Sequence, residues 1–174
     1  MLIQNNAFLK QVSNEVASAD EAKELYQKLL SEAILHSDAV GLAAVQIGIL
    51  GRAFIMQDRD EWLFLINPKL DKIVDSQMIE STEGCLSFPG KSVITRRAKQ
   101  ITVSTQRLDD FDGERQQLTM WDKDSVIFQH EFDHLNGILL FDRVFIKQKR
   151  NDLCNCGKLD IDGKQLKYKK CCGI

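Results

Sequence analysis

The longest regular pattern of apolar positions lies between residues 18 and 36. Apolar side chains recur there at steps of three and four residues, which is typical of an amphipathic helix. The positions are Ala22, Leu25, Tyr26, Leu29, Leu30, Ala33 and Ile34. Ser18 and Glu21 form a capping-box pattern just before this run. The sequence therefore predicts a helix that begins at Ser18 and ends near His36.

The pattern then changes to short runs that are rich in β-branched and aromatic residues, which predict strands. These runs cover residues 52–57, 61–66, 92–97, 100–106 and 115–121. The segment "DDFDGE" is typical of a turn between the last two runs. A second helix is predicted over residues 121–137, where Gly137 provides a stop signal. A helix, several strands and a helix indicate an α+β fold with antiparallel strands rather than alternating βαβ units.

The composition is that of a soluble globular protein. The chain has 174 residues, of which 44% are hydrophobic and 28% charged, enough for one domain and a small appendage. It contains no run of 18 apolar residues, and its first residues do not have the pattern of a signal peptide. We therefore expect a cytoplasmic protein with no membrane partner, in which thiols stay reduced and often bind metals.

Charge and cysteine content divide the chain into two parts. Residues 147–174 carry eight Lys or Arg and three Asp, a net charge of +5, so residues 1–146 carry −7. Cys85 stands alone in mid-chain, whereas four cysteines lie in the last 21 residues: Cys154, Cys156, Cys171 and Cys172. The sequence predicts a main domain over residues 1–147, a basic tail over 148–174, and a separate metal site in each.

The segment "FQHEFDHLNG" contains the pattern HExxH. On a helix, His130 and His134 lie on one face and both can bind one ion. A catalytic site usually takes a third protein ligand and leaves one position open. No glutamate follows Glu131, no histidine follows His134, and Asp142 lies an awkward eight residues on, so the free candidate is Cys85 in "STEGCLSFPG". The plainer alternatives are a chance match and a buried cysteine that acts as a small hydrophobe.

The segment "VGLAAVQIG", residues 40–48, is rich in small residues. Small side chains would let a substrate approach the backbone, and Gln46 supplies a neutral amide donor. A tightly packed junction between a helix and a strand would have the same composition.

The motifs "GLAAVQIG", "EGCLS" and "QHEFDHLNG", in this order, together closely resemble those of peptide deformylase. The resemblance covers roughly residues 1–147. It implies an α+β fold in which the HExxH helix is buried against antiparallel strands. It also implies a hydrolase that removes the N-formyl group from the formyl-methionine terminus of newly made polypeptides and releases formate.

The resemblance also implies roles for individual residues. The ligands of one catalytic divalent metal would be Cys85, His130 and His134, with Fe²⁺ in the cell and Zn²⁺ or Ni²⁺ possible on purification. Glu131 would be the general acid/base. The Gln46 side chain and the backbone N–H of Leu86 would stabilise the oxyanion, and Gly41 would contact the substrate backbone.

An apolar pocket for the methionine side chain is a further expectation. Val126 and Ile127 lie on the ligand face of the predicted helix and, with Val40, could line such a pocket. Their alternative role is as plain core residues.

The tail resembles a SEC-C type zinc-binding segment, with its C-x-C start and its "KYKKCC" end, although its middle is longer. The resemblance implies a second, structural Zn²⁺ held by Cys154, Cys156, Cys171 and Cys172. The positive charge of the tail suggests contact with a polyanion, plausibly the ribosome. The alternatives are a disordered tail with incidental thiols and a merely solubilising surface.

Two other functions are consistent with part of the sequence. One is an HExxH metallopeptidase with an unusual ligand set, which the missing downstream Glu and His disfavour. The other is a non-catalytic deformylase-fold binding module. A pure binder needs neither Glu131 nor Gln46, so the presence of both favours an enzyme.

Overall fold

The computed structural model describes residues 1–174 except residues 60, 75–76, 147–150, 154–159, 168–169 and 171–174. The chain divides into two compact units, Met1–Val144 and Phe145–Ile174. The helices and strands named below belong to the first unit. Cys154, Cys156, Cys171 and Cys172, the predicted ligands of a structural zinc ion, lie outside the described residues.

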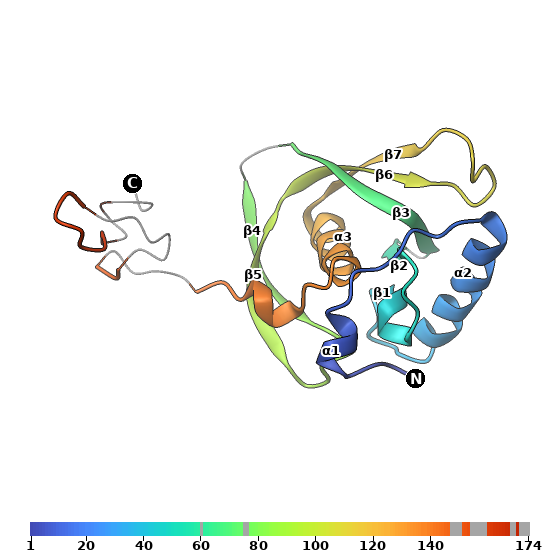
Figure 1. The fold of residues 1–174 in the computed structure, drawn as a ribbon, viewed down its shortest axis with the longest axis horizontal. Helices are drawn as coiled ribbons and strands as arrows, with labels where there is room; N and C mark the ends of the chain where they lie inside the picture. The colour runs from blue at the N-terminus through green and yellow to red at the C-terminus, as the bar shows by residue number, and fades with distance from the viewer. Residues whose placement is uncertain (60, 75–76, 147–150, 154–159, 168–169, 171–174) are drawn as a thin grey trace. The chain divides into compact units, whose positions relative to one another are not determined.

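Two antiparallel sheets form the framework of the first unit (Figure 1). Five strands pair in the order β1-β2-β3-β6-β7; they are β1 (Gly41–Ala43), β2 (Ala53–Asp58), β3 (Glu61–Ile73), β6 (Gln100–Gln106) and β7 (Gln116–Trp121). The second sheet is the hairpin of β4 (Met78–Gly84) and β5 (Ser92–Ala98). The helices are α1 (Asn6–Leu9), α2 (Ala19–Ala33), α3 (Asp122–Leu135) and two 3₁₀ helices, η1 (Ala44–Ile47) and η2 (Leu140–Arg143). The predicted α+β fold with antiparallel strands is confirmed.

Both long helices were predicted. At the start of α2 the Ser18 hydroxyl accepts from the Glu21 N–H at 3.2 Å, while the Glu21 carboxylate accepts from the Ala17 N–H at 2.8 Å rather than from Ser18. The helix ends at Ala33, three residues before the predicted end. After α3, Gly137 has a φ of +69°, so its left-handed conformation stops the helix as predicted.

The five predicted strands exist, but the sequence did not predict β1 or β4. β1 has only three residues, and β4 ("MIESTEG") has little apolar alternation. β3 extends seven residues past the predicted end at Ile66. It does so through a register shift after Ile66, where Asn67 has a φ of +47° and its side chain bonds to the backbone of Val16.

Strand β2 is buried on both faces over most of its length. Phe54 and Met56 belong to the hydrophobic cluster that contains apolar residues of α3, whereas Ala53 and Ile55 belong to the cluster that contains those of α2. Since successive side chains of a strand point to opposite faces, α3 and α2 cover opposite faces of the five-stranded sheet. The continuous apolar run of β2 follows from this arrangement.

α3 contacts strands of both sheets, and most of its side chains are buried (Figure 1). Four of the buried side chains are polar or charged: Ser125, Glu131, Asp133 and His134. An unpaired buried polar group is destabilising. Ser125 and Asp133 find partners on β5, at the Ala98 carbonyl and the Arg97 guanidinium.

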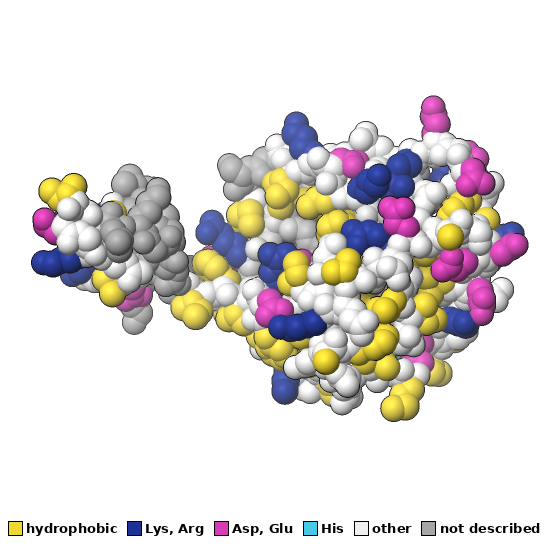
Figure 2. Space-filling model, in the orientation of Figure 1, with side chains coloured by type: hydrophobic (Ala, Val, Ile, Leu, Met, Phe, Trp, Pro, Cys, Tyr) yellow, Lys and Arg dark blue, Asp and Glu magenta, His cyan; other side chains and the backbone are white. Residues whose placement is uncertain are grey.

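The surface of the first unit is mixed. Figure 2 shows basic, acidic and apolar side chains interspersed over the visible face. No helix among the described residues is long and apolar enough to cross a membrane.

Gly137 provides a test of how the N-terminal segment is held against the end of α3. A Cβ at Gly137 would overlap the backbone oxygen of Lys10 and lie 2.8 Å from its carbonyl carbon. Gly137→Ala should therefore combine a left-handed strain of about 1–2 kcal/mol with an overlap cost of about 1–3 kcal/mol. Urea unfolding measures the loss of stability. Gly90→Ala is the control, because Gly90 has a φ of +71° but open space around its Cβ, so equal losses in the two variants would contradict this account.

Candidate metal centre and active site

Three potential metal ligands meet between the two sheets. His130 and His134 lie one turn apart on α3, and Cys85 follows directly after β4. One ligand atom from each lies within 4.8 Å of the others, and the Cys85 sulfur is 3.3 Å from Nε2 of His134. The structure thus brings together the three residues that were predicted to bind the catalytic metal.

His130 is oriented by a buried carboxylate. Its Nδ1 lies 2.8 Å from Oε2 of Glu83 on β4, which leaves Nε2 as the nitrogen available to a metal. Burial alone would raise the pKa of Glu83, but hydrogen bonds from Arg97 and His130 lower it to about 2. Glu83 is therefore an anion that fixes the ring of His130.

The donor set fits a divalent transition metal, since thiolate and imidazole are its common ligands and three of them leave a position open. Burial lowers the pKa of His130, but its contacts with Cys85 and Glu83 outweigh burial and raise the pKa to about 10. The site thus attracts positive charge, and a metal ion and a proton compete for it. Burial lowers the pKa of His134 well below its ordinary value, which keeps this imidazole neutral and able to bind a metal.

Glu131 lies next to the two histidines and is nearly inaccessible to solvent, with 4% of its surface exposed. Burial raises its pKa to about 7, so the carboxylate can both accept and release a proton near neutral pH. Its Oε2 has no hydrogen-bond partner among the described residues. It is the one acidic group of the centre that is left free for a reactant.

Gly41 makes room for this carboxylate. A Cβ at Gly41 would overlap Oε1 of Glu131 and lie 2.9 Å from its Cδ and Cγ. Gly41 was predicted to contact the substrate backbone. That contact stays a prediction, and the structure shows that a side chain at this position would displace Glu131.

The amide of Gln46 is aimed at the same centre. Its Oε1 accepts a hydrogen bond from the Ala43 N–H at 2.8 Å, which fixes the orientation of the amide. The NH₂ end then faces the Ser87 hydroxyl at 3.3 Å and the Cys85 sulfur at 3.5 Å. Leu86 follows Cys85 in the chain and is partly buried against the α2 side of the core.

A cavity opens beside these residues. Its lining includes all of the predicted site residues of the catalytic domain except His134, which lies deeper: Val40, Gly41, Gln46, Cys85, Leu86, Val126, Ile127, His130 and Glu131. Val126 and Ile127 are 8% and 7% exposed, so they belong to the cavity wall and to the core at once. Val40 is 37% exposed and lies nearer the solvent.

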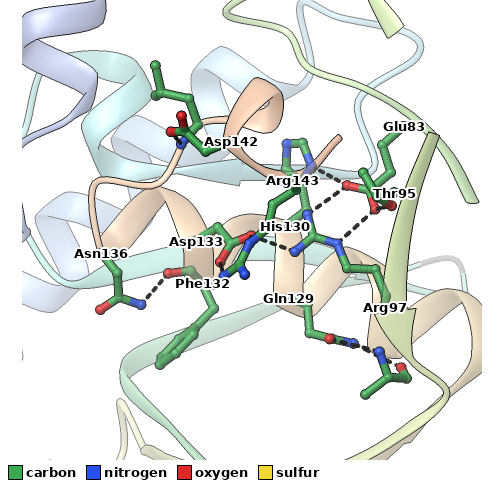
Figure 3. A network of polar contacts seen from close by, with 12 residues as sticks. Glu83, Thr95, Arg97, Gln129, His130, Phe132, Asp133, Asn136, Asp142 and Arg143 are labelled. Atoms are coloured by element: carbon green, nitrogen blue, oxygen red, sulfur yellow. Dashed lines mark hydrogen bonds and ion pairs between the residues drawn. The ribbon is translucent and has the colours of Figure 1, made fainter. Parts of the chain in front are cut away.

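The sequence analysis missed the charged residues behind the ligands. Glu83, Thr95, Arg97 and Asp133 form a buried polar network around His130 (Figure 3). A signal for Glu83 was available: it stands two residues before Cys85, and residues two apart in a strand share a face. Asp133, inside the HExxH segment, cannot face the metal together with both histidines and must find a partner elsewhere.

A thiol and two imidazoles around one point, beside a buried carboxylate and a cavity, are typical of metal-dependent hydrolases. A family model described as Polypeptide deformylase matches residues 1–151. The peptide deformylase of Finegoldia magna is 35% identical over 144 residues, which are 82% of this chain and 86% of the relative. That of Thermotoga petrophila is 38% identical over 136 residues, 78% of this chain and 80% of the relative.

Solved structures of peptide deformylases are also similar to this chain. The crystal structure of peptide deformylase from Thermotoga maritima has a TM-score of 0.75 at 34% identity and covers 84% of this chain and 97% of its own. A class I type b peptide deformylase from Acinetobacter baumannii, crystallised with Met-Ala-Ser bound, has a TM-score of 0.73 at 26% identity and covers 83% and 97%. The chain belongs to the polypeptide deformylase family, an enzyme family that depends on a metal and acts on formylated nascent peptides.

The close approach of Gly41 to Glu131 yields a prediction. Gly41→Ala should lower the rate of formate release from a formyl-Met tripeptide by about 10²-fold, because displacing a reacting group by about 1 Å has an effect of that order. Metal content should not change, since no ligand moves.

Gly51→Ala is the matched control. Its Cβ would lie 2.9 Å from a methyl carbon of Leu25, a buried side chain of α2 outside the metal centre. It should lower stability while activity is retained. If Gly41→Ala is as active as Gly51→Ala, the position of Glu131 does not require the space left by a glycine at position 41.

Proposed function

We propose that residues 1–147 form a deformylase domain that removes the formyl group from the formyl-methionine terminus of newly made polypeptides. Cys85, His130 and His134 would hold one divalent metal, Fe²⁺ in the cell and Zn²⁺ or Ni²⁺ after purification in air. The observation that carries this proposal is the meeting of these three ligands next to Glu131, a buried carboxylate with an elevated pKa.

The reaction is hydrolysis of one amide bond. When bound, the metal would lower the pKa of its water strongly, toward ~7, and would polarise the formyl carbonyl. Glu131 accepts a proton from the attacking water as the water oxygen bonds to the formyl carbon. Glu131 then delivers that proton to the departing amine when the carbon–nitrogen bond breaks. The products are formate and a free amino terminus.

Two donors would stabilise the negative oxygen that develops on the formyl carbon. They are the side-chain NH₂ of Gln46, which the Ala43 N–H orients toward Cys85, and the backbone N–H of Leu86. A donor of this kind typically contributes ~3–4 kcal/mol to the transition state.

The methionine side chain would enter the cavity along Val126 and Ile127, with Val40 closer to solvent and Gly41 against the peptide backbone. The thiolate of Cys85 has two effects on the metal. Its negative charge makes the ion a weaker Lewis acid than three neutral histidines would, and it makes an Fe²⁺ centre prone to oxidation.

The acid/base role of Glu131 is tested by Glu131→Gln, which keeps the shape of the side chain and removes its basicity. Formate release from a formyl-Met tripeptide should fall by about 10²–10⁴-fold, while the metal content, measured by elemental analysis, stays the same. Glu80→Gln on the exposed side of β4 is the control. Wild-type activity in Glu131→Gln would refute the assignment, and cleavage of an internal peptide bond by the metal-loaded enzyme would indicate a metallopeptidase instead.

For the tail, residues 148–174, we propose a SEC-C-like zinc site formed by Cys154, Cys156, Cys171 and Cys172. Support comes from the described residues between the two cysteine pairs. Leu153 and Lys167 form an antiparallel bridge, and the chain reverses at Asp160, whose N–H donates to the Lys164 carbonyl at 2.8 Å. The chain reversal thus pairs the residue before the first cysteine pair with a residue close to the second. A segment this short has no room for a core and needs a metal or a similar cross-link to fold.

The same tail is proposed to contact the ribosome. With four thiolates and one Zn²⁺ the net charge of +5 on residues 147–174 would fall to about +3, and a basic surface favours a polyanion such as ribosomal RNA.

Elemental analysis and co-sedimentation test the tail. The full-length chain should hold one zinc ion more than a Cys154→Ser/Cys171→Ser variant, and both should keep the catalytic metal. At low salt the full-length chain should sediment with ribosomes more than residues 1–147 do, and added salt should abolish the difference. Equal zinc content would refute the zinc site, and equal sedimentation would refute the ribosome contact.

A further inference from the structure

A chain of alternating charges leads from His130 through Glu83, Arg97 and Asp133 to Arg143 (Figure 3). Its first link is the contact of 2.8 Å between Nδ1 of His130 and Oε2 of Glu83. Arg97 on β5 then grips both oxygens of Glu83, through Nε at 2.8 Å and Nη2 at 2.9 Å. The orientation of His130 therefore depends on how Arg97 holds Glu83.

Arg97 also forms an ion pair with a second carboxylate. Its Nη1 donates to Oδ2 of Asp133 at 2.5 Å. Asp133 is held from its other side by Arg143 of η2, whose Nε and Nη2 donate to its two oxygens at 2.9 and 2.6 Å. Figure 3 shows the guanidinium groups of Arg97 and Arg143 meeting at Asp133.

The two carboxylates and two guanidiniums cancel in charge. The side chains of Glu83, Arg97 and Asp133 are 6%, 4% and 9% exposed, so water does not screen them. Without Arg143, two buried anions would share one cation. Arg97 would then be drawn toward Asp133, which would weaken its paired contact with Glu83.

We propose that Arg143 is a positioning residue for the catalytic metal. It acts through Asp133, Arg97 and Glu83 on His130 and touches neither the substrate nor the metal. Neutralising Asp133 frees Arg97 to hold Glu83 with two hydrogen bonds, and Glu83 in turn keeps Nε2 of His130 aimed at the ion. This inference rests on the proposed role of His130 as a metal ligand.

Arg143 suits an experiment better than Arg97 does. Its side chain is 45% exposed, so its replacement leaves the core intact, whereas removing the buried Arg97 threatens folding. A plain structural role for Arg143, holding η2 to α3, would affect stability only. The test therefore needs a readout from the ring of His130 itself.

The chain has only three histidines, His36, His130 and His134, and none lies in the tail. The ring nitrogens of the full-length Zn²⁺-loaded protein can therefore be assigned by ¹⁵N NMR, and zinc bound to the tail does not affect them. In Arg143→Gln the Nδ1 proton of His130 should exchange with solvent roughly tenfold faster than in the wild type. The kcat for formate release should fall roughly tenfold, which is the lower end of the effects of groups that orient a metal ligand. KM should not change. Arg143→Lys keeps the charge but not the paired contact and should be intermediate.

Arg107→Gln is the matched control, because Arg107 makes a similar paired contact with Asp109 in an exposed loop, at 2.9 and 2.5 Å. It should match the wild type in both readouts. In an Asp133→Asn background, Arg143→Gln should have no further effect, since the charge that it neutralises is gone.

Proton exchange and kcat at the wild-type level in Arg143→Gln, with only a lower melting temperature, would overturn the inference. If that variant does not fold, wild-type values in Arg143→Lys would overturn it equally. A wild-type protein that binds Zn²⁺ without a change at the His130 nitrogens, or that releases no formate, would instead refute the proposed function.

Discussion

The buried charges behind the metal ligands are stable only as a set. Moving a single ion from water into a protein costs several kcal/mol, and removing one partner of a buried pair typically costs about 3–5 kcal/mol. Glu83, Arg97 and Asp133 are almost fully enclosed, so each requires the others in place. The position of His130, and with it the metal centre, depends on this balance of charge.

The same balance explains how the β4–β5 hairpin is held. β4 is mostly exposed and contributes few apolar side chains to the core, so hydrophobic burial fixes it only weakly. Glu83 from β4, Arg97 from β5 and Asp133 from α3 join the hairpin to the helix instead. These contacts attach the hairpin to the helix and also orient His130. The stability of the fold and the geometry of the site therefore depend on the same residues.

Sequence reasoning predicted the parts of the protein that depend on residue type and local spacing. The long helices follow from their apolar period, and Cys85 was predicted as the third ligand because few other residues in the chain can bind a metal. β4 was missed because its inward residue is the charged Glu83, where an apolar pattern would have been needed. The pairing of Arg97 with Asp133 joins residues 36 apart in the chain, and no local pattern indicates such a contact. The zinc site of the tail stays a prediction.

The three candidate ligands come from separate parts of the fold: two from one turn of α3 and one from the end of β4. A bound ion is therefore also a tertiary cross-link. An ion present at 100 times its dissociation constant stabilises the folded state by about 2.7 kcal/mol. In a cell short of the metal, newly made copies would open more often at the hairpin and be degraded sooner, so the abundance of the enzyme would follow the metal supply.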